Sequence, residues 1–118
     1  MLNLAEIRDK RRLNARYVYE NLKSPAFELL FDELPDGSTL FCIPALVERD
    51  RREHILDQLM TRGTLLGTLL DRWNFIPAGQ ETWFKNEVDF MARNVLIPIN
   101  EFLDEQAMER LVCELNRI

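Results

Sequence analysis

Residues 95–115, VLIPINEFLDEQAMERLVCEL, decide the fold because they place a strand directly before the clearest helix of the chain. The apolar, β-branched run 95–99 is typical of a short strand. Asp104 can cap the helix that follows, and Leu103 and Met108 have the spacing of a hydrophobic staple across its start. The predicted buried face of this helix consists of Met108, Leu111, Val112 and Leu115.

A long helix is predicted over residues 4–22, which contain neither Gly nor Pro. Its apolar stripe is interrupted in the middle, where Arg11 takes the place of a core residue. Either the helix packs on the domain only through its C-terminal half, or its basic turn contacts something outside this chain. Leu13 and Tyr17 form a second apolar edge, which indicates a helix that touches more than one surface. The main stripe consists of Leu4, Ile7, Ala15, Val18 and Leu22.

Two strands are predicted next, over residues 27–31 and 39–47. The segment 34–38, LPDGS, contains the residue types that favour tight turns, so we expect a β-hairpin or a β-turn-β connection. Pro44 lies inside the second strand and has no N–H for a ladder. It therefore predicts an edge strand or a bulge.

A second helix is predicted to begin at Asp50, which has capping-box spacing to Glu53. Gly63 is placed to end this helix in the left-handed conformation. The expected apolar face consists of Ile55, Leu56, Leu59 and Met60.

Residues 64–70 predict a strand, 71–82 a loop, and 83–93 a third helix. The expected buried residues of that helix are Phe84, Val88 and Met91. The complete order predicts an α+β fold. We expect a two-layer sandwich, in which a small sheet of three or four strands carries helices on one face and is preceded by a long N-terminal helix.

The composition is that of one soluble domain spanning residues 1–118, with 47% hydrophobic and 30% charged positions. No apolar run approaches the roughly 18 residues of a membrane span, so we expect no membrane contact. The N-terminus lacks the apolar core of a signal peptide. Cys42 and Cys113 lie far apart in a chain that needs no disulfide, which favours reduced thiols and a cytoplasmic protein.

The charge is unevenly distributed, because residues 1–23 carry six basic side chains and three acids while the whole chain has a net charge of −5. We expect this basic helix to be a solvated face or to dock on an acidic partner, with Arg8, Arg11 and Arg12 as candidate partner contacts. The acidic chain has no aromatic-basic interleaving, so nucleic-acid binding is not expected.

Few residues suggest chemistry, since the chain has one histidine, no metal-ligand spacing and no Gly-rich phosphate loop. We expect no metal site, and His54 is interpreted as a surface residue. The two cysteines are interpreted as small hydrophobes rather than nucleophiles. Arg72, Trp73 and Asn74 place a guanidinium, an indole and an amide on one loop. This set suits a polar ring or a phosphate, or else the aromatic residues close the open end of the sheet.

Six short stretches are spread along the chain: KRRLNA at 10–15, YENL at 19–22, RDRR at 49–52, LMTRG at 59–63, NVLIPI at 94–99 and FLDEQ at 102–106. Together they resemble the C-terminal portion of DegT/DnrJ/StrS-type enzymes. These are pyridoxal-phosphate-dependent enzymes of the aspartate-aminotransferase fold, which mostly act on nucleotide-linked keto-sugars. The resemblance implies the small domain of such an enzyme, with residues 1–23 as the helix that crosses from the large domain.

In that family the cofactor lysine and the phosphate-binding residues belong to the large domain. The lysines here, Lys10, Lys23 and Lys85, stand in no setting that matches the Schiff-base lysine. We therefore transfer no catalytic and no cofactor-binding residue, and the resemblance implies pyridoxal phosphate only for the full-length family. The segment 72–74 occupies the place where family members approach the sugar.

Three functions follow as hypotheses. The first is the small domain of a nucleotide-sugar aminotransferase, as a fragment, a remnant or half of a split enzyme. It would not be catalytic alone and would bind a nucleotide-sugar only when a large-domain partner completes the site. The alternative is a freestanding interaction or dimerisation module that uses the basic N-terminal helix. The third is a small ligand-binding domain centred on residues 72–75.

Overall fold

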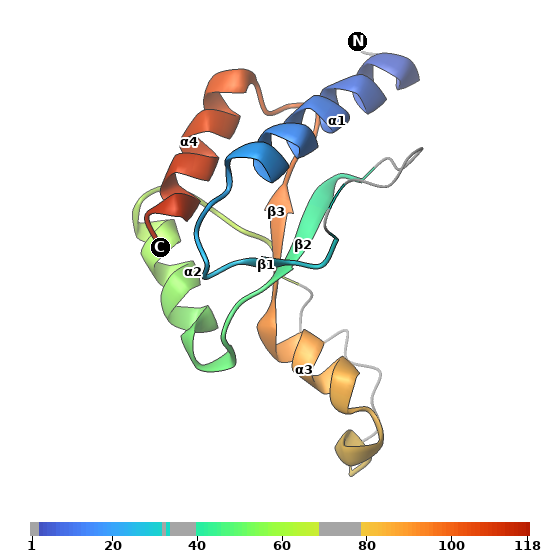
Figure 1. Cartoon of the computed structure of the whole chain (residues 1–118), viewed down its shortest axis with the longest axis vertical. Helices are drawn as coiled ribbons and strands as arrows, with labels where there is room; N and C mark the ends of the chain where they lie inside the picture. Colours follow the sequence, from blue (N-terminus) through green and yellow to red (C-terminus); the bar gives the residue numbers. More distant parts are fainter. Residues whose placement is uncertain (1–2, 32, 34–39, 69–78) are drawn as a thin grey trace.

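Three antiparallel strands form the sheet in the order β1-β2-β3 (Figure 1). They are β1 (Glu28–Leu29), β2 (Cys42–Leu46) and β3 (Asn94–Pro98). The computed structural model describes residues 3–31, 33, 40–68 and 79–118. The predicted pairing of the two early strands is confirmed, since Leu29 lies opposite Ala45, whereas the predicted turn at 34–38 lies outside the described residues.

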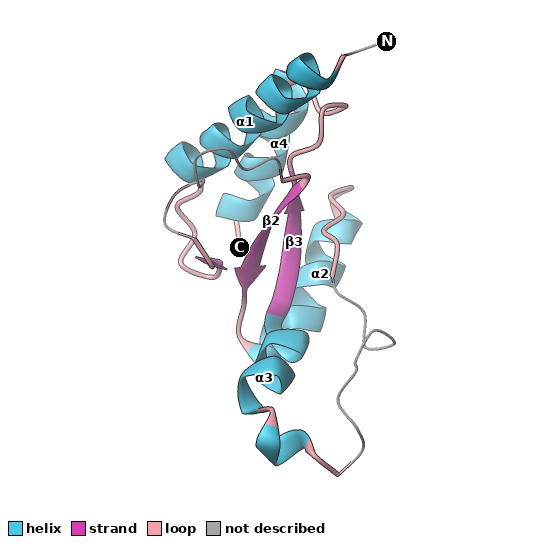
Figure 2. Ribbon diagram, turned by 90° about the vertical axis from the view of Figure 1, so that its right-hand side faces the viewer, coloured by secondary structure: helices cyan, strands magenta, loops and turns pink. Residues whose placement is uncertain are grey.

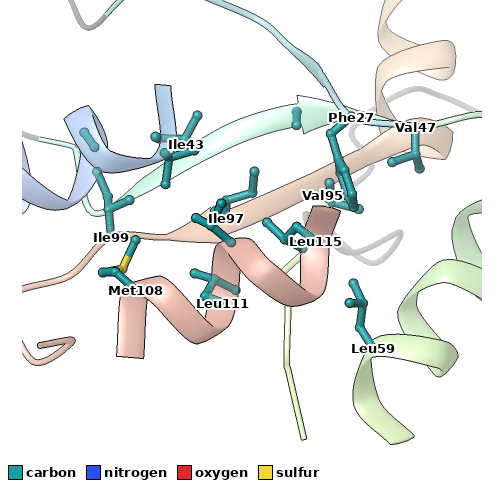
Figure 3. Packing of buried hydrophobic residues seen from close by; sticks show 14 of the residues in the cluster. Phe27, Ile43, Val47, Leu59, Val95, Ile97, Ile99, Met108, Leu111 and Leu115 are labelled. Atoms are coloured by element: carbon teal, nitrogen blue, oxygen red, sulfur yellow. The ribbon is translucent and has the colours of Figure 1, made fainter. Parts of the chain in front are cut away.

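Three helices cover one face of this sheet: α1 (Leu4–Asn21), α2 (Arg52–Thr61) and α4 (Glu105–Asn116). Alternate residues of β2 and β3 point into a common core with these helices, and Ile43 lies opposite Ile97 (Figure 3). The predicted α+β sandwich is therefore confirmed. The core consists of Ala15, Val18, Phe27, Ile43, Ala45, Val47, Ile55, Leu59, Val95, Ile97, Ile99, Met108, Leu111, Val112 and Leu115.

Helix α4 follows the prediction closely. The side chain of Asp104 accepts a hydrogen bond from the backbone N–H of Ala107 at 2.8 Å, which is the expected N-cap. All four residues of the predicted apolar face are buried, and Leu103 packs against the same core.

The buried residues of helix α1 all lie in its C-terminal half, as in the first of the two explanations for its interrupted stripe. Its buried residues are Asn14, Ala15 and Val18, whereas Leu4 is 85% exposed. A capping box that we did not predict begins the helix, because Asn3 and Glu6 exchange side-chain-to-backbone hydrogen bonds.

The prediction for Pro44 is wrong, since β2 is the central strand and its register with β3 has no bulge. The N–H of Leu30 donates to the carbonyl of Pro44 at 3.4 Å, so the nitrogen of Pro44 also faces β1. Proline cannot return that bond. Strand β1 ends at Leu29, directly before the proline would have to donate.

The predicted capping box at the start of α2 is also wrong. Residues Arg49–Arg51 form a 3-10 turn, α2 begins at Arg52, and no side chain caps its N-terminus. The predicted end is confirmed, because Gly63 has a φ of +84° and its N–H donates to the carbonyl of Met60 at 2.9 Å. Ile55 and Leu59 are buried as expected, but Met60 is 55% exposed.

The strand predicted over residues 64–70 is not formed within the described residues 64–68. Only Gly67 pairs there, as a single antiparallel bridge whose N–H and carbonyl both bond to Leu96. A Cβ added at Gly67 would lie 3.4 Å from the Cβ of Leu96, so the glycine permits a close approach to the outer edge of β3.

Helix α3 (Lys85–Arg93) confirms the third predicted helix but not its burial. None of its residues is buried, and Phe84, just before it, is 37% exposed. Both views place α3 at the opposite end of the sheet from α1, away from the core (Figures 1 and 2). The amphipathic pattern predicted the helix correctly, but none of the other described elements buries the apolar residues of α3. No helix of the described residues is long and apolar enough to cross a membrane.

Candidate functional site

Asn14 joins α1 to the connection between β3 and α4. Its buried side-chain amide donates to the carbonyls of Ile99, Asn100 and Leu103 at 3.3, 3.0 and 3.1 Å. These carbonyls lie between the end of β3 and the start of α4, outside the ladder and the helix, and the carbonyl of Asn100 also accepts from the N–H of Leu103 at 3.2 Å. One amide therefore fixes the end of the sheet to the middle of α1.

Arg11 and Glu101 form an ion pair at the same junction. The Nε of Arg11 donates to the Glu101 carboxylate at 2.7 Å, and the two side chains are 24% and 11% exposed. The hydrogen bond from Arg11, together with a backbone hydrogen bond, holds the pKa of Glu101 below its ordinary value. Arg11 thus interrupts the apolar stripe because it meets an acid of its own chain.

The other two predicted partner contacts lie elsewhere on α1. Arg8 is exposed, with its Nε 3.5 Å from the carboxylate of Asp9. Arg12 is half-buried, and its Nε has no hydrogen-bond partner among the described residues. The role of Arg8, Arg11 and Arg12 in partner binding stays a prediction.

The C-terminal ends of α1 and α4 are also joined. The side-chain oxygen of Asn116 accepts hydrogen bonds from the backbone N–H groups of Lys23 and Ser24 at 2.7 and 3.0 Å. Its amide donates to the carbonyl of Asn21 at 2.9 Å. Helix α1 is thus held to the strand-to-helix connection at its middle and to α4 at its end.

A groove of about 370 Å³ lies between α1 and α4. Leu13, which is 60% exposed, and the half-buried Tyr17 supply apolar surface there. The second apolar edge predicted for the long helix is therefore present, and it lines this groove. The complete lining is Lys10, Leu13, Asn14, Arg16, Tyr17, Glu20, Glu105 and Met108.

Arginines gather where α3 meets β3. Arg52 donates to the carbonyl of Met91 at 2.7 Å, and Arg93 donates to the carbonyl of Val47 at 2.9 Å. Arg93 also pairs with Asp89 at 3.0 Å. Arg52 thus bonds a carbonyl in the last turn of α3, and Arg93 joins the same turn to the residue that follows β2, where both cations also complement the helix dipole.

The predicted substrate-contact residues, Arg72, Trp73 and Asn74, lie outside the described residues. Their proposed role stays a prediction.

The lysines do not fit a covalent pyridoxal-phosphate site. Lys23 and Lys85 are exposed, and Lys10 is half-buried on the rim of the α1–α4 groove. A Schiff-base lysine is activated by desolvation in an apolar pocket or by a neighbouring cation, and these side chains lie on open helix or loop surfaces. We derive no chemical step through the cofactor from this chain.

The remaining reactive side chains are dispersed. His54 is exposed on α2, as predicted, and Cys113 is exposed on α4 rather than packed as a small hydrophobe. Cys42 is a half-buried free thiol, and burial raises its pKa. Within the part of the chain that the structure describes, no three His, Cys, Asp or Glu residues could hold a metal ion together.

Comparison with solved structures gives clear matches. PseC of Helicobacter pylori, an aminotransferase involved in the biosynthesis of pseudoaminic acid, matches 94% of this chain with a TM-score of 0.76 and 20% identity. DesV of S. venezuelae matches 97% of the chain with a TM-score of 0.76 and 18% identity. A DegT DnrJ EryC1 StrS aminotransferase of Brucella abortus matches 95% with a TM-score of 0.68 and 18% identity.

The chain shares its fold with about one third of an aminotransferase. It covers 32% of PseC, 32% of DesV and 31% of the Brucella abortus aminotransferase. The resemblance seen in the sequence is thus confirmed at the level of the fold. No family model and no curated protein matches the sequence.

Two stretches that carried the resemblance meet at the junction just described. Asn14 belongs to the first stretch and donates to the carbonyl of Ile99, which ends the NVLIPI stretch. Neither Asn14 nor Glu101 was predicted as a residue of this junction. The signal for them was available, since Asn14 lies beside Ala15 on the stripe predicted to be buried, where a polar residue needs a partner.

Proposed function

We propose that this chain acts as the C-terminal small domain of a pyridoxal-phosphate-dependent nucleotide-sugar aminotransferase. The observation that carries the proposal is the coverage: the fold of nearly the whole chain corresponds to about a third of each matched aminotransferase. The pieces of sequence that resemble the DegT/DnrJ/StrS family support the same assignment. We also place the protein in the cytoplasm.

The contribution of such a domain is mechanical rather than chemical. Asn14 and the Arg11–Glu101 pair hold α1 on the strand-to-helix connection, and Asn116 holds its end on α4. We infer that α1, the helix that would cross from the large domain, moves with the sheet as one body. The cofactor and its lysine would come from a large-domain partner, and the chain alone would be catalytically silent.

An absorbance titration with pyridoxal phosphate tests whether the isolated chain can form a Schiff base with the cofactor. We expect no band of a protein-bound Schiff base, because the three lysines are not placed in a desolvated pocket. Borohydride reduction followed by peptide mapping gives a second readout that does not depend on turnover.

The control is the triple variant K10R/K23R/K85R, which keeps every charge but removes every side-chain amine able to form the imine. Both proteins should give the same spectrum. A band in the wild-type chain that disappears in the triple variant, with reduced cofactor on one of these lysines, would contradict the proposal.

A further inference from the structure

We propose that the edge of α1 formed by Lys10, Leu13, Tyr17 and Glu20 pairs with the same edge of a second copy of this chain, with the two helices antiparallel. We call these four residues the pairing edge. The proposal rests on α1 and α4 alone and does not depend on the likeness to aminotransferases.

The spacing of the pairing edge is that of a helix–helix contact. Positions 10, 13, 17 and 20 are separated by three, four and three residues, so their side chains share one face of α1. All four line the groove of about 370 Å³ between α1 and α4, whose floor includes the buried Met108. Leu13 is 60% exposed there, so this chain leaves an apolar side chain of its own groove uncovered.

The pairing edge is complementary to itself. A two-fold axis at the level of residue 15 places Leu13 of one copy against Tyr17 of the other, and Lys10 against Glu20. Each contact then occurs twice, as a closed two-fold interface requires. The apolar pair lies in the middle and the opposite charges lie outside it, the arrangement in which charge sets partner and register. This self-complementarity is why we commit to a second copy rather than to another protein.

The pairing edge is separate from the three arginines predicted as partner contacts. Arg11 is bonded to Glu101 of its own chain at 2.7 Å, and neither Arg8 nor Arg12 lines the groove. Arg16 and Glu105 do line it, from α1 and α4 respectively, and they add opposite charges at its rim.

Sedimentation velocity of the full chain over a concentration series tests the proposal. The wild-type chain should show a reversible monomer–dimer equilibrium. In the single variants Lys10→Glu and Glu20→Lys, like charges face each other twice, and the association constant should fall by about tenfold or more. The exchanged variant K10E/E20K restores both opposite pairs, so it should recover most of the wild-type association.

Arg8→Glu is the matched control, because it reverses a charge on the exposed part of α1 outside the groove and should leave association unchanged. Circular dichroism of each variant checks that the helix content is retained, and recovery in K10E/E20K separates lost pairing from lost folding. A chain that stays monomeric over the series, an exchanged variant that does not recover, or an equal loss in Arg8→Glu would overturn the proposal. The last result would point to the basic edge of α1 instead.

Discussion

Two polar side chains on the apolar stripe of α1 determine how that helix is attached. Asn14 and Arg11 stand where a simple stripe would place Leu or Ala, and each has its partner on the β3–α4 connection. A buried polar group without a partner lowers the stability of the fold. Removing either side chain should therefore destabilise the chain, because its partner on the β3–α4 connection loses a hydrogen bond.

Replacing Asn14 by Ala should lower the free energy of unfolding by about 1–3 kcal/mol, because the carbonyls of Ile99 and Leu103 lose the side-chain amide that donates to them. Urea denaturation followed by circular dichroism measures the change. Asn86→Ala is the matched control, since Asn86 is exposed on α3 and should shift the midpoint little. Equal midpoints for the two variants would show that the Asn14 bonds are not stabilising.

The Arg11–Glu101 pair should make stability depend on pH. The folded-state pKa of Glu101 lies below its ordinary value, so the stabilisation is complete above the unfolded-state pKa and is lost as the pH falls through the folded-state pKa. Glu101→Gln should therefore be less stable than wild type at neutral pH, and the difference should shrink in acid. Urea midpoints across the acid range measure it.

The companion variant Arg11→Gln removes the same hydrogen bond from the other side. It should lose the same pH-dependent increment, and R11Q/E101Q should add little to either single change. A difference between wild type and Glu101→Gln that stays constant from neutral pH into acid would contradict this assignment.

At the scale of elements, the end of α2 depends on one backbone conformation. Gly63 has a φ of +84°, and a Cβ there would meet open space, so any cost of substitution is conformational rather than steric. Gly63→Ala should destabilise the fold by about 1 kcal/mol, and Gly63→Asn should cost less, because Asn tolerates the left-handed region better. Thermal unfolding of both variants measures the order. Equal losses in the two variants would argue against a conformational cause.

The elements predicted best from the sequence are those whose signals are local. Asp104 caps α4 and Gly63 ends α2 through hydrogen bonds to groups within a few residues, so both helix ends could be predicted from the local sequence. The capping box predicted at Asp50 is absent because the chain makes a 3-10 turn there before α2 begins. The prediction for Pro44 was wrong because β1 is short and its pairing with β2 stops just before the proline. The length of that neighbouring strand is not visible in the sequence around Pro44.

The junction around Asn14 could not be predicted from neighbouring residues in the sequence. Its partners lie 85 to 89 positions along the chain, and only the assembled fold brings them together. A helical pattern likewise cannot say whether a partner layer exists, which is why α3 was predicted correctly as a helix and wrongly as a buried one. The resemblance to a family needed no such contacts, because it used stretches of sequence in order.

At the scale of the whole molecule, the core lies between the sheet and the helices α1, α2 and α4, and the matched aminotransferases are about three times as long as this chain. The proposed large-domain partner and the proposed second copy would use different parts of α1. The first needs α1 to continue toward another domain, whereas the second needs only the groove edge. Both use a helix whose attachment is fixed by Asn14, Arg11 and Asn116.

Helix α3 gives the molecule two levels of stability. Because none of its residues is buried, opening its first turns exposes little apolar surface and leaves the core intact. Its last turn is held differently, by Arg52 on the carbonyl of Met91 and by the buried Asn94, which begins β3. Local opening should therefore start at Lys85 and stop near Met91. We therefore expect the native chain to exchange between the complete fold and one that has lost only the outer part of α3.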